Sequence, residues 1–216
     1  MKQNIEMKNF YSEIKKQKPV RNTGYKKTGI ELPTRILVCS PSGSGKSNWV
    51  LNFLALNSGT FSKIVICVKN SDEPLYNLLR EESDDVEFSE EGIIPPINDF
   101  KIHKSSCIVF DDLVLEKDQS KIGEYFIRGR KLGITCIYIT QSYYRTPKII
   151  RINCRYIIIK RLSSIKDLKL ILSEYNLSTD INDVLQLYEE STKDFLSFLL
   201  IDTQNNIFNN GFLKVN

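Results

Sequence analysis

The sequence predicts an α/β fold in which a mostly parallel central sheet lies between two layers of helices. Short, fully apolar runs of strand length alternate with segments of helical periodicity, which is typical of βαβ units. The last apolar pair, residues 195–202 and 207–215, flanks a polar run, so we expect a C-terminal β-hairpin that extends the sheet. With 216 residues, 41% hydrophobic and 26% charged, the chain has the composition of one globular domain with a small extension.

The expected elements follow one another in regular order. Five apolar runs are predicted to be strands of the parallel part of the sheet: 34–39, 63–68, 106–110, 134–140 and 155–159. Five segments are predicted to be helices: 48–56, 73–82, 118–132, 164–176 and 180–190. Residues 83–100 are acidic and then proline-rich, and they are predicted to form a loop.

A loop rich in glycine and serine joins the first predicted strand to the first predicted helix. Residues 40–47 match G-x-x-x-x-G-K-[ST] except at the first position, where Ser40 replaces glycine and is expected to strain the turn mildly. In this motif backbone N–H groups and a helix N-terminus bind phosphate, Lys46 reaches the β- and γ-phosphates, and the Ser47 hydroxyl binds Mg²⁺. The predicted nucleotide-binding residues are Ser40, Pro41, Ser42, Gly43, Ser44, Gly45, Lys46, Ser47 and Asn48. The sequence therefore predicts a three-layer P-loop NTPase domain.

Two acids, Asp111 and Asp112, follow the apolar run 106–110. Ligands of parallel α/β sheets bind beyond the carboxyl ends of the strands, so both acids should lie at the same edge as the phosphate loop. Asp111 is predicted to bind Mg²⁺ together with Ser47, and Asp112 to orient and deprotonate the attacking water. Alternatively, Asp112 only caps the turn that follows it.

The base of the nucleotide is predicted from motifs that the sequence lacks. Small GTPases require D-x-x-G after this strand, whereas Asp111 is followed by Asp-Leu-Val. Residues 69–72 do not fit the guanine-binding N-K-x-D motif. ATP and Mg²⁺ are therefore the predicted cofactors.

Three further side chains are candidates for the catalytic site. Gln141 follows the run 134–140 and either contacts the γ-phosphate as a sensor or simply ends the strand. Arg130, and after it Arg128, are candidates for an arginine that reaches the γ-phosphate of a neighbouring subunit. Because cations also stabilise a helix C-terminus, both arginines have a structural interpretation as well.

Positive charge is concentrated at the start of the chain. Residues 1–30 contain eight Lys/Arg and two Glu, a net charge of +6, whereas the whole chain carries +4. We expect a basic, flexible arm over residues 1–30 and the P-loop ATPase domain over residues 31–216. The arm either contacts nucleic acid or only solvates the domain.

The sequence predicts an intracellular protein that does not interact with a membrane. No apolar run approaches the ~18 residues that a transmembrane helix needs, and the first residues lack the apolar stretch of a secretory signal. The five cysteines form no C-x-x-C pair, and the single histidine, His103, has no ligand-spaced partner. Buried reduced thiols are favoured over a metal or disulfide role.

Four blocks of sequence together resemble one known family. They are residues 40–47, 108–112 (IVFDD), 126–133 (FIRGRKLG) and 137–144 (IYITQSYY), and the similarity continues through 145–153 (RTPKIIRIN). Over about residues 31–215 the chain resembles the viral DNA-packaging ATPases of the FtsK–HerA superfamily, nearest the poxvirus-type branch. Two departures are the missing first glycine of the phosphate loop and the Asp111–Asp112 pair in place of the usual Asp–Glu.

The resemblance implies an ATP-driven motor, a homo-oligomeric ring that pushes double-stranded DNA into a preformed capsid. It implies that Gln141 is the sensor and that an arginine near Arg130 acts across subunits. Expected partners are double-stranded DNA, further copies of the chain and capsid proteins, and the expected location is the host cytoplasm, a viral factory or the virion.

Two alternatives in function and one in structure stay open. The first alternative is another DNA-stimulated ATPase of the superfamily, such as a conjugation or segregation motor. The second is an ATP-dependent switch or assembly scaffold. Tyr143, Tyr144 and Arg145, with Lys148 and Arg151, either grip DNA or include core tyrosines under a loop.

Overall fold

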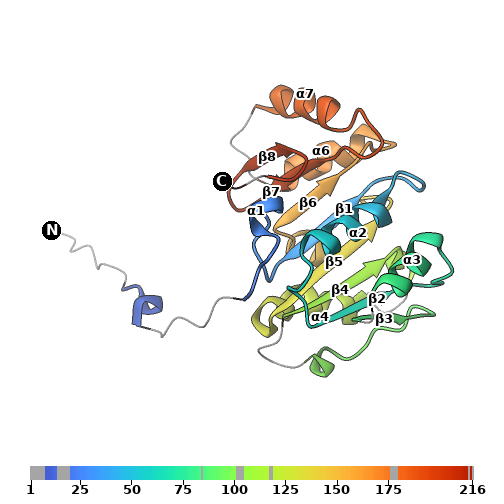
Figure 1. Ribbon diagram of the computed structural model, residues 1–216. Helices are drawn as coiled ribbons and strands as arrows, with labels where there is room; N and C mark the ends of the chain where they lie inside the picture. Colours follow the sequence, from blue (N-terminus) through green and yellow to red (C-terminus); the bar gives the residue numbers. More distant parts are fainter. Residues whose placement is uncertain are drawn as a thin grey trace.

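The computed structural model describes residues 8–13, 20–83, 85–100, 105–116, 119–175, 180–213 and 215. Eight strands form one sheet in the order β3-β2-β4-β5-β1-β6-β7-β8 (Figure 1). The strands are β1 Arg35–Cys39, β2 Lys63–Cys67, β3 Val86–Ser89, β4 Ser106–Asp111, β5 Ile134–Thr140, β6 Tyr156–Ile159, β7 Leu199–Asp202 and β8 Ile207–Asn210. Strands β1 to β6 pair in parallel, whereas β7 and β8 are antiparallel and form the terminal hairpin.

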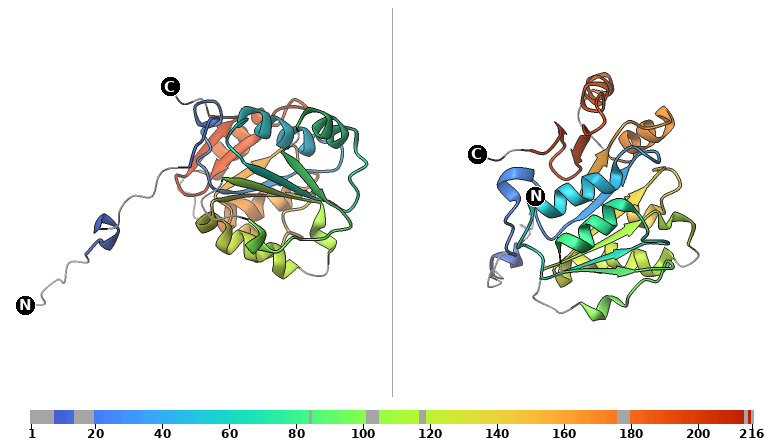
Figure 2. Two further views of the ribbon diagram at one scale, coloured as in Figure 1. Left: turned by 60° about the horizontal axis from the view of Figure 1, so that its bottom comes forward. Right: turned by 45° about the vertical axis from the view of Figure 1, so that its right-hand side comes forward.

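Helices cover both faces of the sheet, so the molecule has three layers (Figure 2). The α-helices are α1 Tyr25–Thr28, α2 Lys46–Leu56, α3 Pro74–Glu82, α4 Gln119–Arg128, α5 Lys148–Arg151, α6 Ile165–Glu174 and α7 Ile181–Ser191. The short 3-10 helices are η1 Phe10–Glu13, η2 Ile97–Asp99, η3 Leu113–Leu115 and η4 Gly129–Leu132. Of the helices in the described part of the chain, none combines the length and apolar character of a bilayer-spanning segment.

The side chains of each central strand divide between two apolar cores, because successive residues point to opposite faces of a sheet. In β1, Ile36 and Val38 pack with Trp49 and Phe53 of α2, whereas Leu37 faces the layer of α4 to α7. The four residues of β1 other than Arg35 are fully buried. The predicted three-layer α/β fold, with its mostly parallel sheet and C-terminal hairpin, is confirmed.

The structure differs from the predicted elements at a few places. Residues 83–100 were predicted to be a loop, but Val86–Ser89 forms β3 at the edge of the sheet, parallel to β2. This strand has four residues, and its Glu87 is exposed and pairs with Lys63 at 3.0 Å, so it lacks an apolar run. Strand β7 begins at Leu199 rather than at residue 195, because residues 194–197 form a turn.

The last part of the predicted arm packs on the domain. Thr28 and Ile30 are fully buried, and Thr23 Oγ1 donates a hydrogen bond to the Ser58 carbonyl at 2.8 Å. The amide of Leu213 donates to the Thr28 carbonyl at 3.1 Å, so this segment joins the C-terminal one. Residues 1–7 and 14–19 lie outside the described residues, and the domain division at residue 30 stays a prediction.

Two members of the predicted aromatic and basic stretch belong to the core. Tyr143 is fully buried, and its hydroxyl donates a hydrogen bond to Glu174 Oε2 at 2.8 Å. Arg151 is 8% exposed, pairs with Glu174 Oε1 at 3.0 Å and lies 4.9 Å from the centroid of the Tyr143 ring. Tyr144, 77% exposed, and Arg145 remain at the surface.

We expect Arg151→Ala to lower the free energy of unfolding by about 3 kcal/mol, because the substitution leaves the largely buried Glu174 carboxylate without its ion-pair partner. The matched control is Arg145→Ala, which removes an exposed arginine and should change stability by less than about 0.5 kcal/mol. Urea denaturation of both variants measures the difference. Equal, small effects would show that the ion pair does not stabilise the fold.

Candidate active site

The carboxyl ends of β1, β4 and β5 meet at one edge of the sheet. The Ser40 amide donates a hydrogen bond to the Thr140 carbonyl at 3.1 Å, and the Asp112 amide donates to the Ile139 carbonyl at 3.2 Å. A cleft of about 680 Å³ opens at this edge. Nine predicted residues line it: Ser42, Gly43, Gly45, Lys46, Ser47, Asn48, Asp111, Asp112 and Gln141.

The phosphate loop has the backbone that its glycines allow. Gly43 and Gly45 have φ values of 71° and 83°, in the left-handed region that favours glycine, and α2 begins at Lys46. Lys46 Nζ donates a hydrogen bond to the Pro41 carbonyl at 2.8 Å, which uses one of its three donors. Burial lowers the pKa of Lys46, and Asp111 and Asp112 act in the opposite direction. The ammonium group therefore lies at the loop, facing acids across the cleft.

The serine at the first position of the motif is accommodated without the expected strain. Ser40 is fully buried and does not have a positive φ, so its backbone does not require glycine. The Ser40 and Ser44 hydroxyls are hydrogen-bonded to each other, and Ser44 Oγ donates to the Pro41 carbonyl at 2.6 Å. The expectation of strain is wrong because the side chain of Ser40 joins a hydrogen-bond network inside the loop.

Two carboxylates, Glu73 and Asp111, line the same cleft as the Ser47 hydroxyl. Asp111 Oδ2 accepts a hydrogen bond from the Tyr76 hydroxyl, and Glu73 Oε2 lies 3.5 Å from Ser47 Oγ. Burial raises the pKa of Asp111 to about 6, against the effect of the Tyr76 hydrogen bond. Magnesium in nucleotide sites takes one or two carboxylates and completes its shell with phosphate and water oxygens. Ser47 and Asp111, with Glu73 beside them, fit this ion.

Asp112 and Gln141 contact each other at the cleft. Gln141 Nε2 donates a hydrogen bond to Asp112 Oδ2 at 2.6 Å. Asp112 has φ 52° and precedes η3, but its side chain makes no capping hydrogen bond, which disfavours the capping interpretation. The predicted base and the predicted sensor are thus one hydrogen-bonded pair, and their roles in catalysis stay predictions.

The structure does not bring the two candidate arginines to this cleft. Arg128 ends α4 and forms an ion pair with Glu124, and the Gly133 amide donates a hydrogen bond to the Arg130 carbonyl at 3.2 Å. Both arginines therefore lie near the amino end of β5, whereas Gln141 follows its carboxyl end. Seven residues at about 3.3 Å each separate these ends by about 20 Å. Neither arginine reaches the phosphate loop of its own chain.

The sequence interpretation missed several residues of the cleft. The additional lining residues are Val68, Lys69, Asn70, Glu73, Leu75, Tyr76, Phe195 and Leu196. Glu73 follows the strand next to β4 and precedes Pro74 at the start of α3, so an inspection of every strand end for acids would have found it. Phe195 belongs to no motif, and nothing in the sequence indicates its place beside the loop.

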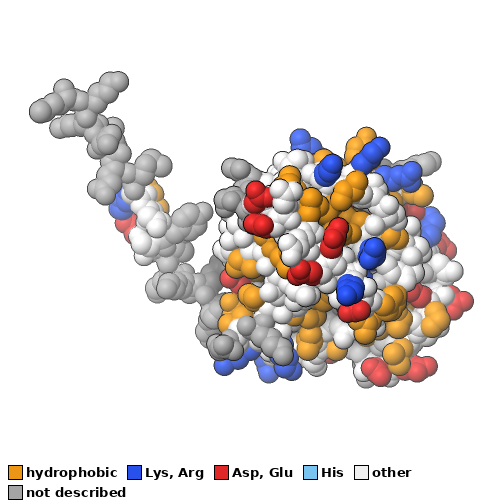
Figure 3. Space-filling model, turned by 90° about the horizontal axis from the view of Figure 1, so that it is seen from above, with side chains coloured by type: hydrophobic (Ala, Val, Ile, Leu, Met, Phe, Trp, Pro, Cys, Tyr) orange, Lys and Arg blue, Asp and Glu red, His pale blue; other side chains and the backbone are white. Residues whose placement is uncertain are grey.

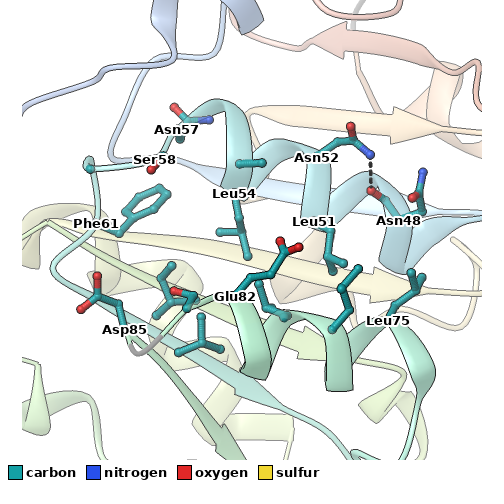
Figure 4. Close-up of a pocket in the computed structure, with 17 residues that line it drawn as sticks. Asn48, Leu51, Asn52, Leu54, Asn57, Ser58, Phe61, Leu75, Glu82 and Asp85 are labelled. Atoms are coloured by element: carbon teal, nitrogen blue, oxygen red, sulfur yellow. Dashed lines mark hydrogen bonds between the residues drawn. The ribbon is translucent and has the colours of Figure 1, made fainter.

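A second groove, of about 520 Å³, lies between α2 and α3 (Figure 4). Leu51, Leu54 and Phe61 contribute its apolar wall, and Glu82 and Asp85 stand at its rim. It shares Asn48 and Leu75 with the first cleft but contains none of the predicted catalytic side chains. Of the predicted nucleotide-binding residues, only Asn48 lines this second groove, so we take the first cleft as the candidate active site.

Solved structures share this fold, although no family model and no curated protein matches the sequence. The crystal structure of B204, the DNA-packaging ATPase from Sulfolobus turreted icosahedral virus, aligns with a TM-score of 0.60 at 18% identity over 85% of this chain and 98% of that chain. B204 from Sulfolobus turreted icosahedral virus 2, in complex with ATP-gammaS, aligns with a TM-score of 0.55 at 17% identity over 82% of this chain and 95% of that chain. The cytoplasmic domain of the Thermomonospora curvata type VII secretion ATPase EccC aligns with a TM-score of 0.54 at 14% identity over 77% of this chain and 24% of that chain. At these identities the likeness shows the fold: this chain has the α/β fold of P-loop ATPases.

We expect Asp111→Asn to stabilise the protein in the absence of nucleotide by on the order of 1 kcal/mol at pH 7, because it removes a buried charge. The folded state binds the Asp111 proton more tightly than the unfolded state. The free energy of unfolding of the wild-type protein therefore falls as the pH rises from about 4 through about 6. The advantage of the variant should appear across that interval and be constant above it.

Urea denaturation at a series of pH values measures this difference. Glu73→Gln removes a neighbouring negative charge that also raises the pKa of Asp111, so it should give a smaller stabilisation over the same pH interval. A stability difference between Asp111→Asn and the wild-type protein that does not change between pH 4 and pH 7 would contradict the proposed cost of the buried carboxylate.

Proposed function

We propose that this chain is an ATP-hydrolysing motor that translocates double-stranded DNA, most specifically to package a viral genome into a capsid. One observation carries the proposal: a single cleft contains the phosphate loop, the acid Asp111 and the hydrogen-bonded pair of Asp112 and Gln141. The B204 structures, which are described as genome-packaging NTPases and include an ATP-gammaS complex, support the choice of nucleotide and of task.

The residues of the cleft divide the work of hydrolysis. The loop amides and Lys46 bind the β- and γ-phosphates, and Gly43 and Gly45 give the loop its shape. Ser47 and Asp111 would hold a magnesium ion, which would supply positive charge to offset the charge developing on the phosphates. Gln141 holds one carboxylate oxygen of Asp112, so that the other oxygen accepts the proton of the attacking water.

The surface next to the catalytic pair is a candidate for DNA contacts. Tyr144, Arg145 and Lys148 follow Gln141 in the chain and are exposed. Phosphate-directed contacts of this type bind DNA of any sequence, as a packaging motor must. On the face shown in Figure 3, basic, acidic and hydrophobic side chains are interspersed, so we do not assign that face to DNA. The basic arm, residues 1–30, remains a second candidate.

The proposal includes partners and a location. A homo-oligomeric ring surrounds the DNA, capsid proteins receive it, and the work takes place inside the host cell, in its cytoplasm or a viral factory, or on the virion. The EccC likeness favours one alternative, a superfamily motor with another cargo. An ATP-dependent switch or assembly scaffold is the other alternative.

We expect ATP turnover by the full chain to rise when double-stranded DNA is added. Asp112→Asn should still bind ATP but hydrolyse it about 10²- to 10⁴-fold more slowly, the usual contribution of a general base. Lys46→Ala should lose nucleotide binding and remain folded, because its side chain contacts the phosphate loop and not the core. Steady-state phosphate release, nucleotide-binding titrations and circular dichroism measure these effects.

The outcomes of this experiment separate the alternatives. Tight ATP binding with negligible turnover, with or without DNA, would favour the switch or scaffold. Turnover that DNA does not change would favour a motor with another cargo. Normal turnover by Lys46→Ala would overturn the assignment of the phosphate loop.

We expect Arg130 to act on the nucleotide of a neighbouring subunit, because it lies at the opposite edge of its own sheet. In the described part of the chain Arg130 forms no ion pair, whereas Arg128 pairs with Glu124, so Arg130 is the better candidate. Arg130→Ala should bind ATP normally but hydrolyse it at least ~10³-fold more slowly. Mixing Arg130→Ala with Lys46→Ala subunits should restore part of the activity, because each intact phosphate loop can then receive an arginine from its neighbour.

Phosphate release is measured across mixing ratios, in assemblies shown by native mass spectrometry to exchange subunits. The matched control is Arg128→Ala, which should hydrolyse ATP at close to the wild-type rate. No recovery at any ratio would show that Arg130 stabilises its helix end rather than a neighbouring site.

A further inference from the structure

An aromatic side chain lies at the rim of the phosphate cleft. Phe195 and Leu196, in the turn between α7 and β7, are 63% and 65% exposed and line the same cleft as Gly45 and Lys46. Large apolar side chains are mostly buried in folded proteins, and exposed ones in a lined cleft indicate a contact surface for a ligand. The proposed catalytic machinery does not use these two side chains.

The turn that presents Phe195 is fixed by several hydrogen bonds. The Ser197 amide and hydroxyl both donate to the Asp194 carbonyl, at 3.1 and 2.6 Å, and the Asp194 amide donates to Ser197 Oγ at 2.9 Å. Lys160, which is 3% exposed, donates from Nζ to the carbonyls of Phe195 at 2.6 Å and Ser197 at 3.2 Å. A buried lysine thus holds this turn, and the backbone at Phe195 has a defined position.

The ring of Phe195 lies against the phosphate loop with space over its face. A Cβ atom placed on Gly45 would be 3.2 Å from Cζ of Phe195, so the ring edge lies beside the loop at Gly45. Lys160 Nζ lies 5.7 Å from the ring centroid. Among the residues that the structure describes, no other aromatic ring packs on Phe195. A flat, apolar ligand beside the loop would cover this exposed ring.

The strand order determines which part of a bound nucleotide lies beside Phe195. The pair of Asp112 and Gln141 follows β4 and β5, on one side of β1, and must face the γ-phosphate. Lys160 follows β6, on the other side of β1, and its amide donates a hydrogen bond to the Cys39 carbonyl at 3.3 Å. A triphosphate bound along the loop therefore directs its nucleoside toward β6 and Phe195.

We propose that the base of the bound nucleoside triphosphate stacks on Phe195, and that this contact favours purines over pyrimidines. The inference rests on the proposed nucleotide-binding function and adds the subsite for the base. Stacking on an aromatic ring needs a planar π-system and grows with the area covered, so the larger purine binds more tightly. Leu196 extends the apolar surface beside the ring.

The test separates binding of the base from binding of the phosphates. The full chain with Mg²⁺ is titrated calorimetrically with the β,γ-methylene analogues of ATP and UTP and with inorganic triphosphate. Phe195→Ala should weaken the ATP analogue by about 5- to 100-fold, the usual range for loss of a base–aromatic stack. It should reduce the preference for the ATP analogue over the UTP analogue and leave inorganic triphosphate within about twofold of the wild-type value.

Two matched variants complete the experiment. Phe195→Trp retains a ring and should bind the ATP analogue at close to the wild-type affinity. Phe10→Ala removes a phenylalanine that is also 63% exposed but lies outside the cleft, and it should change nothing. Unchanged affinity of Phe195→Ala for the ATP analogue would overturn the proposal, as would an equal loss for inorganic triphosphate, which indicates a disturbed loop. If the wild-type protein binds none of the three ligands, the proposed function itself is wrong.

Discussion

Two backbone hydrogen bonds at the end of β5 hold the site together. The carbonyls of Ile139 and Thr140 accept hydrogen bonds from the amides of Asp112 and Ser40, so a single strand end fixes both the acid pair and the start of the phosphate loop. This requires β5 to lie between β1 and β4 in a parallel sheet, because only then do three carboxyl ends meet. The apolar sequence of β5, buried over its whole length, keeps it in the centre of the sheet.

The charges of the cleft are costly as long as no ligand compensates them. Burial raises the pKa of Asp111 and lowers the pKa of Lys46, and in both cases it disfavours the charged form. Tyr76 and the Pro41 carbonyl satisfy these groups in part. Phosphates and a divalent cation would satisfy both together, so their binding should stabilise the folded state and the nucleotide-competent geometry at once.

Much of this architecture follows from local sequence, and the exceptions have physical causes. The central strands and the phosphate loop were predicted because an apolar run or a glycine at a required backbone conformation is visible in one segment. Strand β3 was missed because an edge strand needs neither length nor an apolar run. Glu73 was missed although it follows β2, because only the acids directly after an apolar strand were considered. Phe195 reaches the cleft through packing between segments distant in the chain, which no local pattern records. The position of Arg130 relative to the phosphate loop likewise depends on the strand order, which residues 126–133 alone do not specify.

The separation of the two sheet edges determines what Arg130 can do. Arg130 lies near the amino end of β5, about 20 Å along that strand from its carboxyl end, which is farther than an arginine side chain extends, so it does not contact phosphates bound at its own chain's loop. Arg130 can contact a bound nucleotide only where the amino edge of the sheet in one subunit faces the carboxyl edge of the sheet in the next. That contact joins two different surfaces, and heterologous contacts of this kind close into rings when the rotation allows it. In the proposed ring, where each subunit supplies Arg130 to its neighbour, hydrolysis would therefore depend on assembly, and each hydrolysis event would involve two adjacent subunits.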